Sequence, residues 1–494
     1  MVFAIPASAQ TADSGRYPEL FQATSKAPQV SVGLEAASIR KRLVDVNTDL
    51  LLHPSAPFLR LNLFRDLELV AAFDHLAPAF GGGFVWVGTV VGHPDSSAMF
   101  SVMGDAVSGS LNWDDQLCQL GFAGNGVHWI NLVNSAALPV CGTTNSMGMS
   151  LPALPHGAGI QTGNPDIDVM VVYSTAAKNA VGGTASMQSR INLAFTETNS
   201  AYSLSGATQE LVLVHSEEMI GYTEPSSFSQ ILTDLRGTND GKMDNVHPLR
   251  DQYGADCVSM ICQNGQYCGI AYLMTNPSSS FASSAFCVVN YSCMTGYYSF
   301  GHELGHNMGC AHDPQNAGSA AYSYSYGFRT SNNQYRTIMA YAPGTRVKRF
   351  SSPNVTYNGY TMGATNQDNA RSLNNTSAIV AAWRAGSGGS TNPVLTVPTL
   401  TAGQFSVFTI ADCQPNSVAL IYYSRTGTGP TSTVYGIADL SVPLYLLPQI
   451  STDAAGWGTT MVRVPNRGTG VTAWFQGVDT STSLWSSNFQ TTVL

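Results

Sequence analysis

Charged side chains are scarce in this sequence. Only 11% of its 494 residues are Asp, Glu, Lys or Arg, and the formal net charge at pH 7 is −9. No long basic run is present, so the positive surface that nucleic-acid binding needs is missing, and we expect no nucleic-acid partner. Uninterrupted apolar stretches of 18 or more residues are also missing, which argues against a membrane span.

The paired C-x2-C spacing of structural zinc sites is absent as well. Six of the nine cysteines nevertheless fall between residues 257 and 310. We expect three disulfides within this stretch and therefore an oxidising compartment, with a second metal site as the alternative. The sequence leaves the pairing open. The nine cysteines are Cys118, Cys141, Cys257, Cys262, Cys268, Cys287, Cys293, Cys310 and Cys413.

The N-terminus lacks the basic start and the full apolar run of a secretory signal peptide. Residues 1–9 do end in Ala7-Ser8-Ala9, an A-x-A-like cleavage site before Gln10. We interpret residues 1–9 as the remnant of a signal, which predicts a secreted, extracellular protein. An ordinary flexible terminus is the alternative.

One stretch carries most of the chemical information. Residues 302–313 read HELGHNMGCAHD, and the first five fit the pattern H-E-x-x-H. Positions four apart share one face of a helix, so His302 and His306 can direct imidazole nitrogens at one metal ion. Glu303 projects beside the pair, where a metal-bound water would lie.

The same stretch supplies a third histidine. Gly309 can adopt the left-handed conformation that ends a helix, and the turn would return His312 to the metal. Three imidazoles leave a fourth position open for water, which is typical of catalytic zinc. The alternative is an ordinary helix with surface histidines, but it does not account for three histidines and a glutamate at ligand spacing.

This run resembles the zinc signature of the metzincin metalloproteases, H-E-x-x-H-x-x-G-x-x-H. A second motif supports the resemblance: residues 337–341 read TIMAY, and Met339, 27 residues beyond His312, would form the methionine turn beneath the zinc. Asp313, directly after the third histidine, resembles the adamalysin/reprolysin (ADAM-like) group. Tyr341 instead resembles the astacin and serralysin turn.

The resemblance covers about residues 165–385 and is strongest to secreted bacterial reprolysin-like proteases. It implies one catalytic zinc held by the three histidines of the motif. It also implies that Glu303 takes a proton from the zinc-bound water and passes it to the leaving amine. Tyr341 would assist by donating its phenolic proton to the oxyanion, and Asp313 would orient the loop or an imidazole.

Residues 10–160 predict a mostly β pro-region. Strand patterns occur at residues 57–70, 84–91, 99–107 and 127–133, separated by Gly, Asp and Asn turns. No catalytic constellation lies here. Its position ahead of a protease resembles the pro-regions of secreted metzincins.

Cys141 lies in the context Cys141-Gly142, which resembles the cysteine switch of related zymogens. A thiolate is a strong zinc ligand, so it would displace the water and silence the enzyme. A Cys118–Cys141 disulfide is the alternative. Residues 151–165 are turn-rich and form the candidate processing segment.

Residues 165–385 alternate strand and helix patterns, which predicts an α/β catalytic domain. By resemblance, residues 269–274 would be the edge strand above the cleft, available to pair with an extended peptide; a plain buried strand is the alternative. The zinc helix is expected over residues 295–309.

Residues 386–393 read GSGGSTNP, a flexible linker. Residues 394–494 show short strand patterns between turns and predict a C-terminal β-sandwich. This module contains no titratable cluster that resembles a site, and it is a candidate for binding a surface or the substrate.

We therefore expect a multidomain, secreted zinc endopeptidase that is made as a proenzyme and acts on polypeptides. An adhesin-like binding protein with little turnover is the main alternative, and hydrolysis of a non-peptide amide is another. Glu303 argues against the binding protein, because zinc binding alone needs only the histidines. Calcium stays open as a second cation, although no calcium loop is evident.

Overall fold

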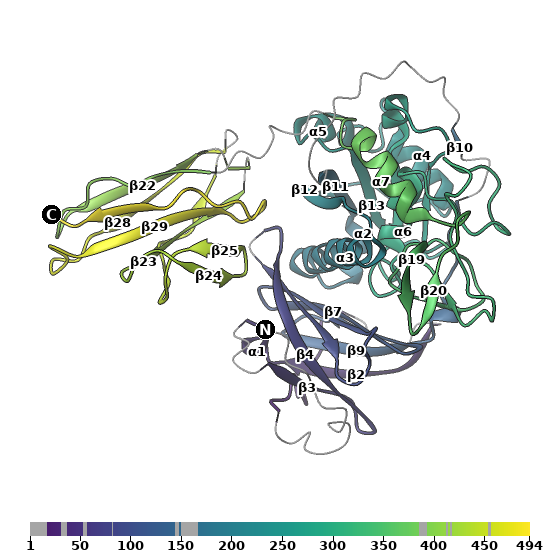
Figure 1. Cartoon of the computed structure of the whole chain (residues 1–494), viewed down its shortest axis with the longest axis horizontal. Coiled ribbons are helices and arrows are strands. Elements are labelled where there is room, and N and C mark those ends of the chain that lie inside the picture. The colour runs from purple at the N-terminus through teal and green to yellow at the C-terminus, as the bar shows by residue number, and fades with distance from the viewer. Residues whose placement is uncertain are drawn as a thin grey trace. The chain divides into compact units, whose positions relative to one another are not determined.

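The computed structural model describes residues 17–30, 37–52, 57–81, 83–143, 148–149, 166–384, 393–411, 413–414, 417–452 and 456–494. The chain forms two compact units (Figure 1), one of residues 1–75 and 86–386 and one of residues 76–85 and 387–494. The expected signal remnant (1–9) and processing segment (151–165) lie outside the described residues, as does almost all of the linker (386–393).

The predicted pro-region forms a nine-stranded sheet with the order β1-β2-β9-β8-β7-β6-β5-β4-β3. Leu59, Leu61 and Leu63 are buried on one face of β3, as their alternation predicts. The strands are β1 (Phe21–Gln22), β2 (Ser38–Val46), β3 (Phe58–Phe64), β4 (Leu67–Pro78), β5 (Phe84–Val90), β6 (Ser97–Met103), β7 (Ala106–Trp113), β8 (Gln116–Phe122) and β9 (Val127–Val133), with helix α1 at Asp49–Leu52.

Two strand predictions in this sheet were wrong in extent. Residues 57–70 are not one strand but the hairpin β3–β4, and residues 99–107 span the turn between β6 and β7. Both turns are only two residues long, so apolar patterning continues across them and hides the reversal.

The catalytic region is built on a five-stranded sheet with the order β12-β11-β13-β16-β14. The first four strands run parallel, and β14 joins antiparallel at the edge. The edge strand predicted over residues 269–274 is thus shorter than expected, because residues 273–274 form a separate strand. The strands are β11 (Asp166–Ser174), β12 (Glu210–Met219), β13 (Cys257–Cys262), β14 (Gly269–Ala271) and β16 (Phe286–Asn290), and the helices between them are α2 (Thr175–Ala180), α3 (Thr184–Ser205), α4 (Phe228–Arg236) and α5 (Val246–Gln252).

The motif helix is shorter than predicted. It is α6 (Ser299–Asn307), and Tyr298 ahead of it has φ 61°, outside the helical range. The predicted start at residue 295 was therefore wrong. Gly309 has φ 89° and turns the chain after the helix, as expected.

The remaining elements of this region are β10 (Gly148–Met149), β15 (Leu273–Met274), β17 (Tyr335–Arg336), β18 (Thr345–Arg346), β19 (Ser352–Tyr357), β20 (Tyr360–Met362) and α7 (Asn369–Val380), with short 3-10 helices at Ser135–Ala137 and Ser279–Ser284.

One disulfide, Cys268–Cys293, ties the start of β14 to the segment before α6. The prediction of three disulfides between residues 257 and 310 was wrong, because Cys257, Cys262, Cys287 and Cys310 are buried thiols. These four cysteines occupy core positions, where an unpaired cysteine packs as a small apolar side chain. Sequence spacing does not separate this role from pairing.

The C-terminal module contains two sheets that share one core. Phe408 and Ile410 of β22 pack in the same cluster as Ile421 of β23 and Phe475 of β29, the packing that a β-sandwich requires. One sheet has the order β21-β22-β28, and the other β26-β23-β29-β30 with β27 beside β23. The strands are β21 (Val394–Thr396), β22 (Phe405–Ala411), β23 (Val418–Ser424), β24 (Pro430–Thr433), β25 (Gly436–Asp439), β26 (Tyr445–Leu446), β27 (Ile450–Ser451), β28 (Gly458–Arg463), β29 (Thr472–Asp479) and β30 (Phe489–Thr492).

Among the described helices, none combines the length and the apolar character needed to cross a membrane.

Candidate metal centre

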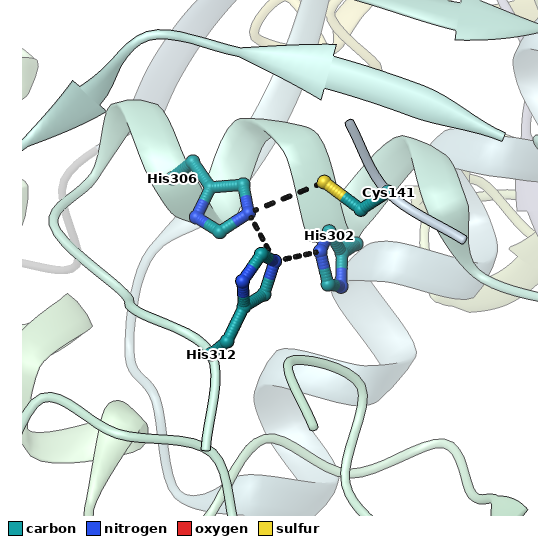
Figure 2. A group of neighbouring side chains, drawn as sticks. All are labelled: Cys141, His302, His306 and His312. Atoms are coloured by element: carbon teal, nitrogen blue, oxygen red, sulfur yellow. Dashed lines mark hydrogen bonds between the residues drawn. The ribbon is translucent and has the colours of Figure 1, made fainter. Parts of the chain in front are cut away.

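Three histidine side chains converge at the end of α6 (Figure 2). His302 and His306 leave the helix one turn apart, and the turn at Gly309 returns His312 to them. The Nε2 atom of His312 lies 3.2 Å from Nε2 of His302 and 3.0 Å from Nε2 of His306. All three side chains are buried. The sequence-predicted ligands therefore do meet in one place.

Backbone carbonyls orient two of these rings. Nδ1 of His302 lies 2.8 Å from the carbonyl oxygen of Ile338, and Nδ1 of His306 lies 2.8 Å from that of Cys310. A neutral imidazole that donates from Nδ1 keeps a lone pair on Nε2. The short Nε2–Nε2 distances are therefore a convergence of lone pairs, which is the arrangement that a metal ligand set needs.

The donor set fits zinc. Nitrogen ligands about 2.0–2.1 Å from a tetrahedral ion lie roughly 3.3 Å apart, close to the spacing observed between the Nε2 atoms. Burial lowers the pKa of His306 to about 4, and burial together with the neighbouring imidazoles holds the pKa values of His302 and His312 well below the usual range. All three rings are therefore neutral, the form that binds metal.

Glu303 lies beside the histidines and is completely buried. Its Oε1 atom has no hydrogen-bond partner among the described residues, and burial raises the pKa of the carboxyl to about 8. The edge strand passes very close: a Cβ atom at Gly269 would lie 2.3 Å from Oε1. Only glycine fits between this strand and the carboxyl group.

Met339 lies behind the motif helix. Its side chain is fully buried, and its sulfur would lie 3.0 Å from a Cβ atom at Gly305 of α6. The absence of a side chain at Gly305 thus lets the methionine approach the helix turn between His302 and His306. This position agrees with the predicted methionine turn.

Comparisons with known proteins agree with this geometry. The model of metallo-peptidase family M12 (Reprolysin_5) matches residues 164–351. A peptidyl-Asp metalloendopeptidase of Stenotrophomonas maltophilia (strain R551-3) is 37% identical over 307 residues, which cover 59% of this chain and 71% of that protein. The protein of the same name from Xanthomonas campestris pv. campestris is 35% identical over 355 residues, 67% of this chain and 83% of its own. This chain belongs to metallopeptidase family M12. It is a zinc metalloendopeptidase of the metzincin type.

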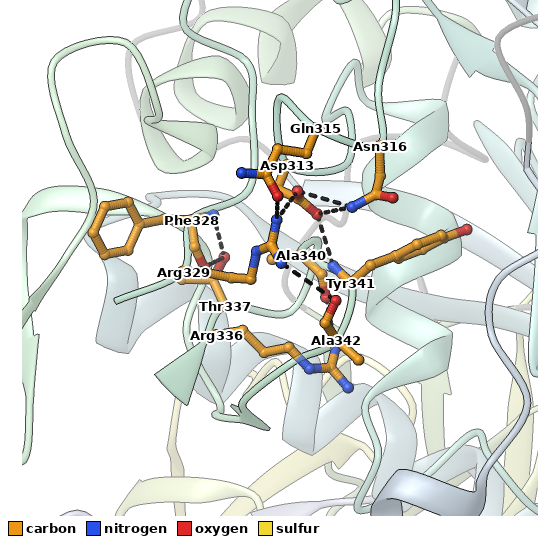
Figure 3. A network of polar contacts seen from close by, with 10 residues as sticks. All are labelled: Asp313, Gln315, Asn316, Phe328, Arg329, Arg336, Thr337, Ala340, Tyr341 and Ala342. Carbon is orange, nitrogen blue, oxygen red and sulfur yellow. Dashed lines mark hydrogen bonds and ion pairs between the residues drawn. The ribbon is translucent and has the colours of Figure 1, made fainter. Parts of the chain in front are cut away.

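In this M12 peptidase, Asp313 joins the third-histidine loop to the methionine turn (Figure 3). Its Oδ1 accepts a hydrogen bond from the backbone N–H of Tyr341 at 2.9 Å, and its Oδ2 pairs with Arg329 at 2.7 Å. Asn316 donates to both carboxylate oxygens. The contacts of Asp313 therefore hold the loop that follows His312, in line with the predicted orienting role for that loop; none of them goes to an imidazole.

Tyr341 faces the metal centre from the methionine turn. Its ring lies 4.2 Å from the His312 ring, centroid to centroid. Its hydroxyl donates a 2.6 Å hydrogen bond to the carbonyl oxygen of Cys141. The phenol of this M12 peptidase is thus already placed against a peptide carbonyl beside the histidines.

Cys141 of the pro-region lies at the same centre. Its Sγ is 3.6 Å from Nε2 of His306 and 3.5 Å from Oε2 of Glu303, and its ligand atom and those of the three histidines all lie within 4.8 Å of one another. Cys118 is a separate buried thiol in β8, so the alternative of a Cys118–Cys141 disulfide was wrong.

Two residues near the centre carried no sequence signal. Thr143 donates to the carbonyl of Ala271 at 3.2 Å and lies 3.4 Å from Oε2 of Glu303. Arg346 is buried nearby, and its charge contributes to lowering the pKa values of all three histidines. A threonine after Cys-Gly and an arginine after the methionine turn match no general motif, so only the fold reveals them.

Proposed function

We propose that this peptidase holds one zinc ion with His302, His306 and His312 and uses Glu303 as its general base. The observation that carries the proposal is the convergence of three imidazole lone pairs beside a buried carboxyl group. When bound, zinc would lower the pKa of a water molecule and polarise the scissile carbonyl. Glu303 would accept the proton of the attacking water and return it to the leaving amine.

Tyr341 would assist by hydrogen bonding. Its hydroxyl donates to a peptide carbonyl beside the histidines, that of Cys141. After removal of the pro-region, the same donor would be free for the scissile carbonyl oxygen, on which negative charge develops.

We propose further that the chain is made as a proenzyme with Cys141 as the zinc-directed plug. A thiol that approaches the histidines this closely would bind zinc as a thiolate and take the place of the attacking water. The segment around it is held on the edge strand: Gly142 N donates to Gly269 O at 2.8 Å, and Cys268 N donates to Val140 O at 3.0 Å. These bonds use backbone groups that an extended substrate would need.

Buried polar contacts also attach the pro-region sheet to the catalytic region. Ser189 Oγ donates to Ser101 O at 2.8 Å and accepts from Ser108 N at 3.0 Å. Gln119 Nε2 donates to Thr295 O at 3.0 Å. An ion pair between Arg349 and Asp95 at 3.1 Å adds to these hydrogen bonds. Water can replace the hydrogen bonds, which suits a partner that later leaves.

The names of the relatives supply a substrate class. They are peptidyl-Asp metalloendopeptidases, and we propose that this enzyme likewise cleaves polypeptides beside aspartate. The A-x-A-like end of residues 1–9 and the Cys268–Cys293 disulfide support the accompanying proposal of secretion.

The C-terminal module remains a proposed binding unit for a surface or the substrate. Phe405, Val407 and Met461 of β22 and β28 are 63%, 48% and 62% exposed. Val407 and Met461 are direct cross-strand partners, so their side chains form one apolar face. Deleting residues 394–494 should weaken retention on an insoluble protein substrate; unchanged retention would reject this role.

Casein digestion by the processed enzyme tests the central proposal. We expect cleavage, its loss on chelation, its return on adding zinc, and its loss in Glu303→Ala despite retained zinc. Arg371→Gln in α7, away from the centre, serves as the matched control and should cleave normally. A fully processed, zinc-loaded enzyme without activity would contradict the proposal.

A further inference from the structure

An open cavity of about 550 Å³ reaches Tyr341, whose ring lies 4.2 Å from the ring of His312. Tyr341 forms one side of it, and the pro-region segment that leads into Cys141 forms another through Leu138 and Val140. A peptide that replaces this segment would therefore pass the same cavity next to the scissile bond.

Two arginines form the polar wall of this cavity. Arg336 and Arg346 are direct partners on the paired strands β17 and β18, and their exposed fractions are 4% and 9%. Arg336 is held by three hydrogen bonds, to Gly344 O at 2.8 Å, to Ala340 O and to the Tyr297 hydroxyl at 3.0 Å. These bonds use all three of its nitrogens and fix it in place.

Arg346 is less fully bonded. It donates to Tyr297 O at 3.1 Å and stacks over the Tyr297 ring at 4.3 Å, but its buried Nε has no hydrogen-bond partner in the described part of the chain. A buried guanidinium nitrogen without an acceptor is costly, a cost that Arg349 also carries at its Nε.

Neither arginine forms an ion pair with a carboxylate among the described residues. Their neighbours do: Arg329 pairs with Asp313 at 2.7 Å, and Arg349 with Asp95 at 3.1 Å. Two adjacent buried cations repel each other, and the charge of Arg346 adds to burial in lowering the pKa of Arg336 to about 10. A bound anion would relieve both the repulsion and the missing hydrogen bond.

The field of this pair favours negative charge. Burial alone would raise the pKa of Tyr297, yet the charges of Arg346 and Arg336 outweigh burial and leave it below the usual range. The pro-region segment brings Leu138 and Val140 to the cavity, and neither carries a carboxylate. Among the described residues, the arginines thus have no carboxylate in an ion pair.

We infer that Arg346, supported by Arg336, receives the side-chain carboxylate of an acidic substrate residue next to the scissile bond. This assignment rests on the proposed peptidase function and locates its substrate preference in two residues. Guanidinium groups suit the task because their planar N–H donors match carboxylate geometry.

Paired peptides test the inference. Two substrates identical except for Asp or Asn at one position are given to the processed enzyme, and kcat/KM is measured for both. We expect the wild type to prefer Asp by on the order of 100-fold or more, because a site built for a charged group rejects an analogue that lacks the charge. Arg346→Gln should reduce this ratio at least about tenfold while cleavage of the Asn peptide persists.

Control variants separate a lost pocket from a lost fold. Arg346→Lys should keep part of the preference, and Arg371→Gln should keep all of it. Continued cleavage of the Asn peptide by Arg346→Gln shows that the enzyme is folded. If Arg346→Gln cleaves neither peptide, the Asp-to-Asn ratio of Arg346→Lys decides. A full wild-type ratio in Arg346→Lys overturns the inference. An unchanged ratio in Arg346→Gln overturns it while leaving the peptidase proposal intact. A zinc-loaded wild type that cleaves neither peptide nor casein overturns both.

Discussion

The two sheets of the first unit relate differently to the metal centre. The catalytic sheet and the loops around it position the three histidines, the glutamate and the tyrosine. The nine-stranded pro-region sheet sends none of its described side chains there; only the segment after it does, through Cys141 and Thr143. The catalytic region thus contains all the residues of the proposed reaction, and the predicted pro-region reaches the centre through Cys141 and Thr143.

The contacts of the two regions also differ in where they lie. The catalytic region holds its centre with buried groups of its own, such as the Asp313–Arg329 pair. The predicted pro-region is attached through serine hydroxyls, one glutamine amide, edge-strand hydrogen bonds and the Asp95–Arg349 ion pair. We therefore expect the loss of pro-region contacts to raise activity and the loss of contacts within the catalytic region to lower it.

Cys141→Ser in the unprocessed chain should produce the largest change. Losing a buried ligand that pairs with a cation costs roughly 3–5 kcal/mol, so proenzyme activity on a short peptide should rise by about 10²- to 10⁴-fold. The Cys141→Ser/Glu303→Ala double variant is the control for contaminating proteases. If Cys141→Ser stays as silent as the wild-type proenzyme, the thiol is not the plug.

Tyr341→Phe should lower kcat of the processed enzyme by about 100-fold, the usual loss for one donor to a developing oxyanion. The same change in the proenzyme removes the hydrogen bond to Cys141 O and should loosen the pro-region. Measured KM should move little. A fall in activity carried by KM alone would assign the phenol to substrate binding.

Asp313→Asn should lower kcat/KM by about tenfold, because the loop after His312 loses its ion pair with Arg329. Zinc affinity should weaken in parallel, which competition with a chelator measures. Asp251→Asn removes a more exposed ion pair, with Arg384, and is the matched control. Equal behaviour of the two variants would deny Asp313 a special role.

Glu197→Gln should give the smallest effect, a change in pH dependence. Glu197 of α3 accepts hydrogen bonds from Gly296 N at 2.9 Å and from Ser110 of the pro-region, and burial raises its pKa to about 7. Release of the pro-region re-exposes the carboxyl and lowers this pKa. The released state then binds fewer protons, so release is favoured as pH rises toward 7.

The other ionisable groups near Glu197 titrate outside this window. Burial lowers the pKa of Lys348 to about 8, and burial keeps the pKa of Tyr298 well above its usual range. Glu197→Gln should therefore flatten pro-region release between pH 5 and 7 by a few-fold, measured on the nicked protein by gel filtration. Glu210 is exposed on β12, and Glu210→Gln should leave the pH dependence of pro-region release unchanged. A flattening in Glu210→Gln as well would show that Glu197 is not its cause.

The sequence predicted the centre better than its surroundings. The histidines, Glu303 and Gly309 lie within one short stretch, so helix geometry and the turn at Gly309 bring them together. The edge strand was expected from the family resemblance, whereas its residues alone fitted a plain buried strand equally well. By contrast, Arg336 and Arg346 meet through a two-residue strand pairing, which leaves no periodic pattern to detect.

The errors share a physical cause. Cysteine spacing does not reveal whether thiols face one another or pack singly among apolar side chains, so three disulfides were expected where one exists. Short turns do not interrupt apolar patterning, so two hairpins were taken for single strands. Each outcome depends on tertiary contacts rather than on local sequence.

The pairing of the pro-region segment with β14 also has a pharmacological meaning. Residues 138–143 combine a thiol beside three imidazoles, backbone hydrogen bonds to the edge strand and a carbonyl that accepts from Tyr341. In medicinal-chemistry terms this is the outline of a thiol peptidomimetic, with the anchoring groups already in register. Exchanging Leu138 or Val140 for an acidic group would extend such a compound toward Arg346. A compound copied from the segment that we propose blocks the centre would then be a selective inhibitor.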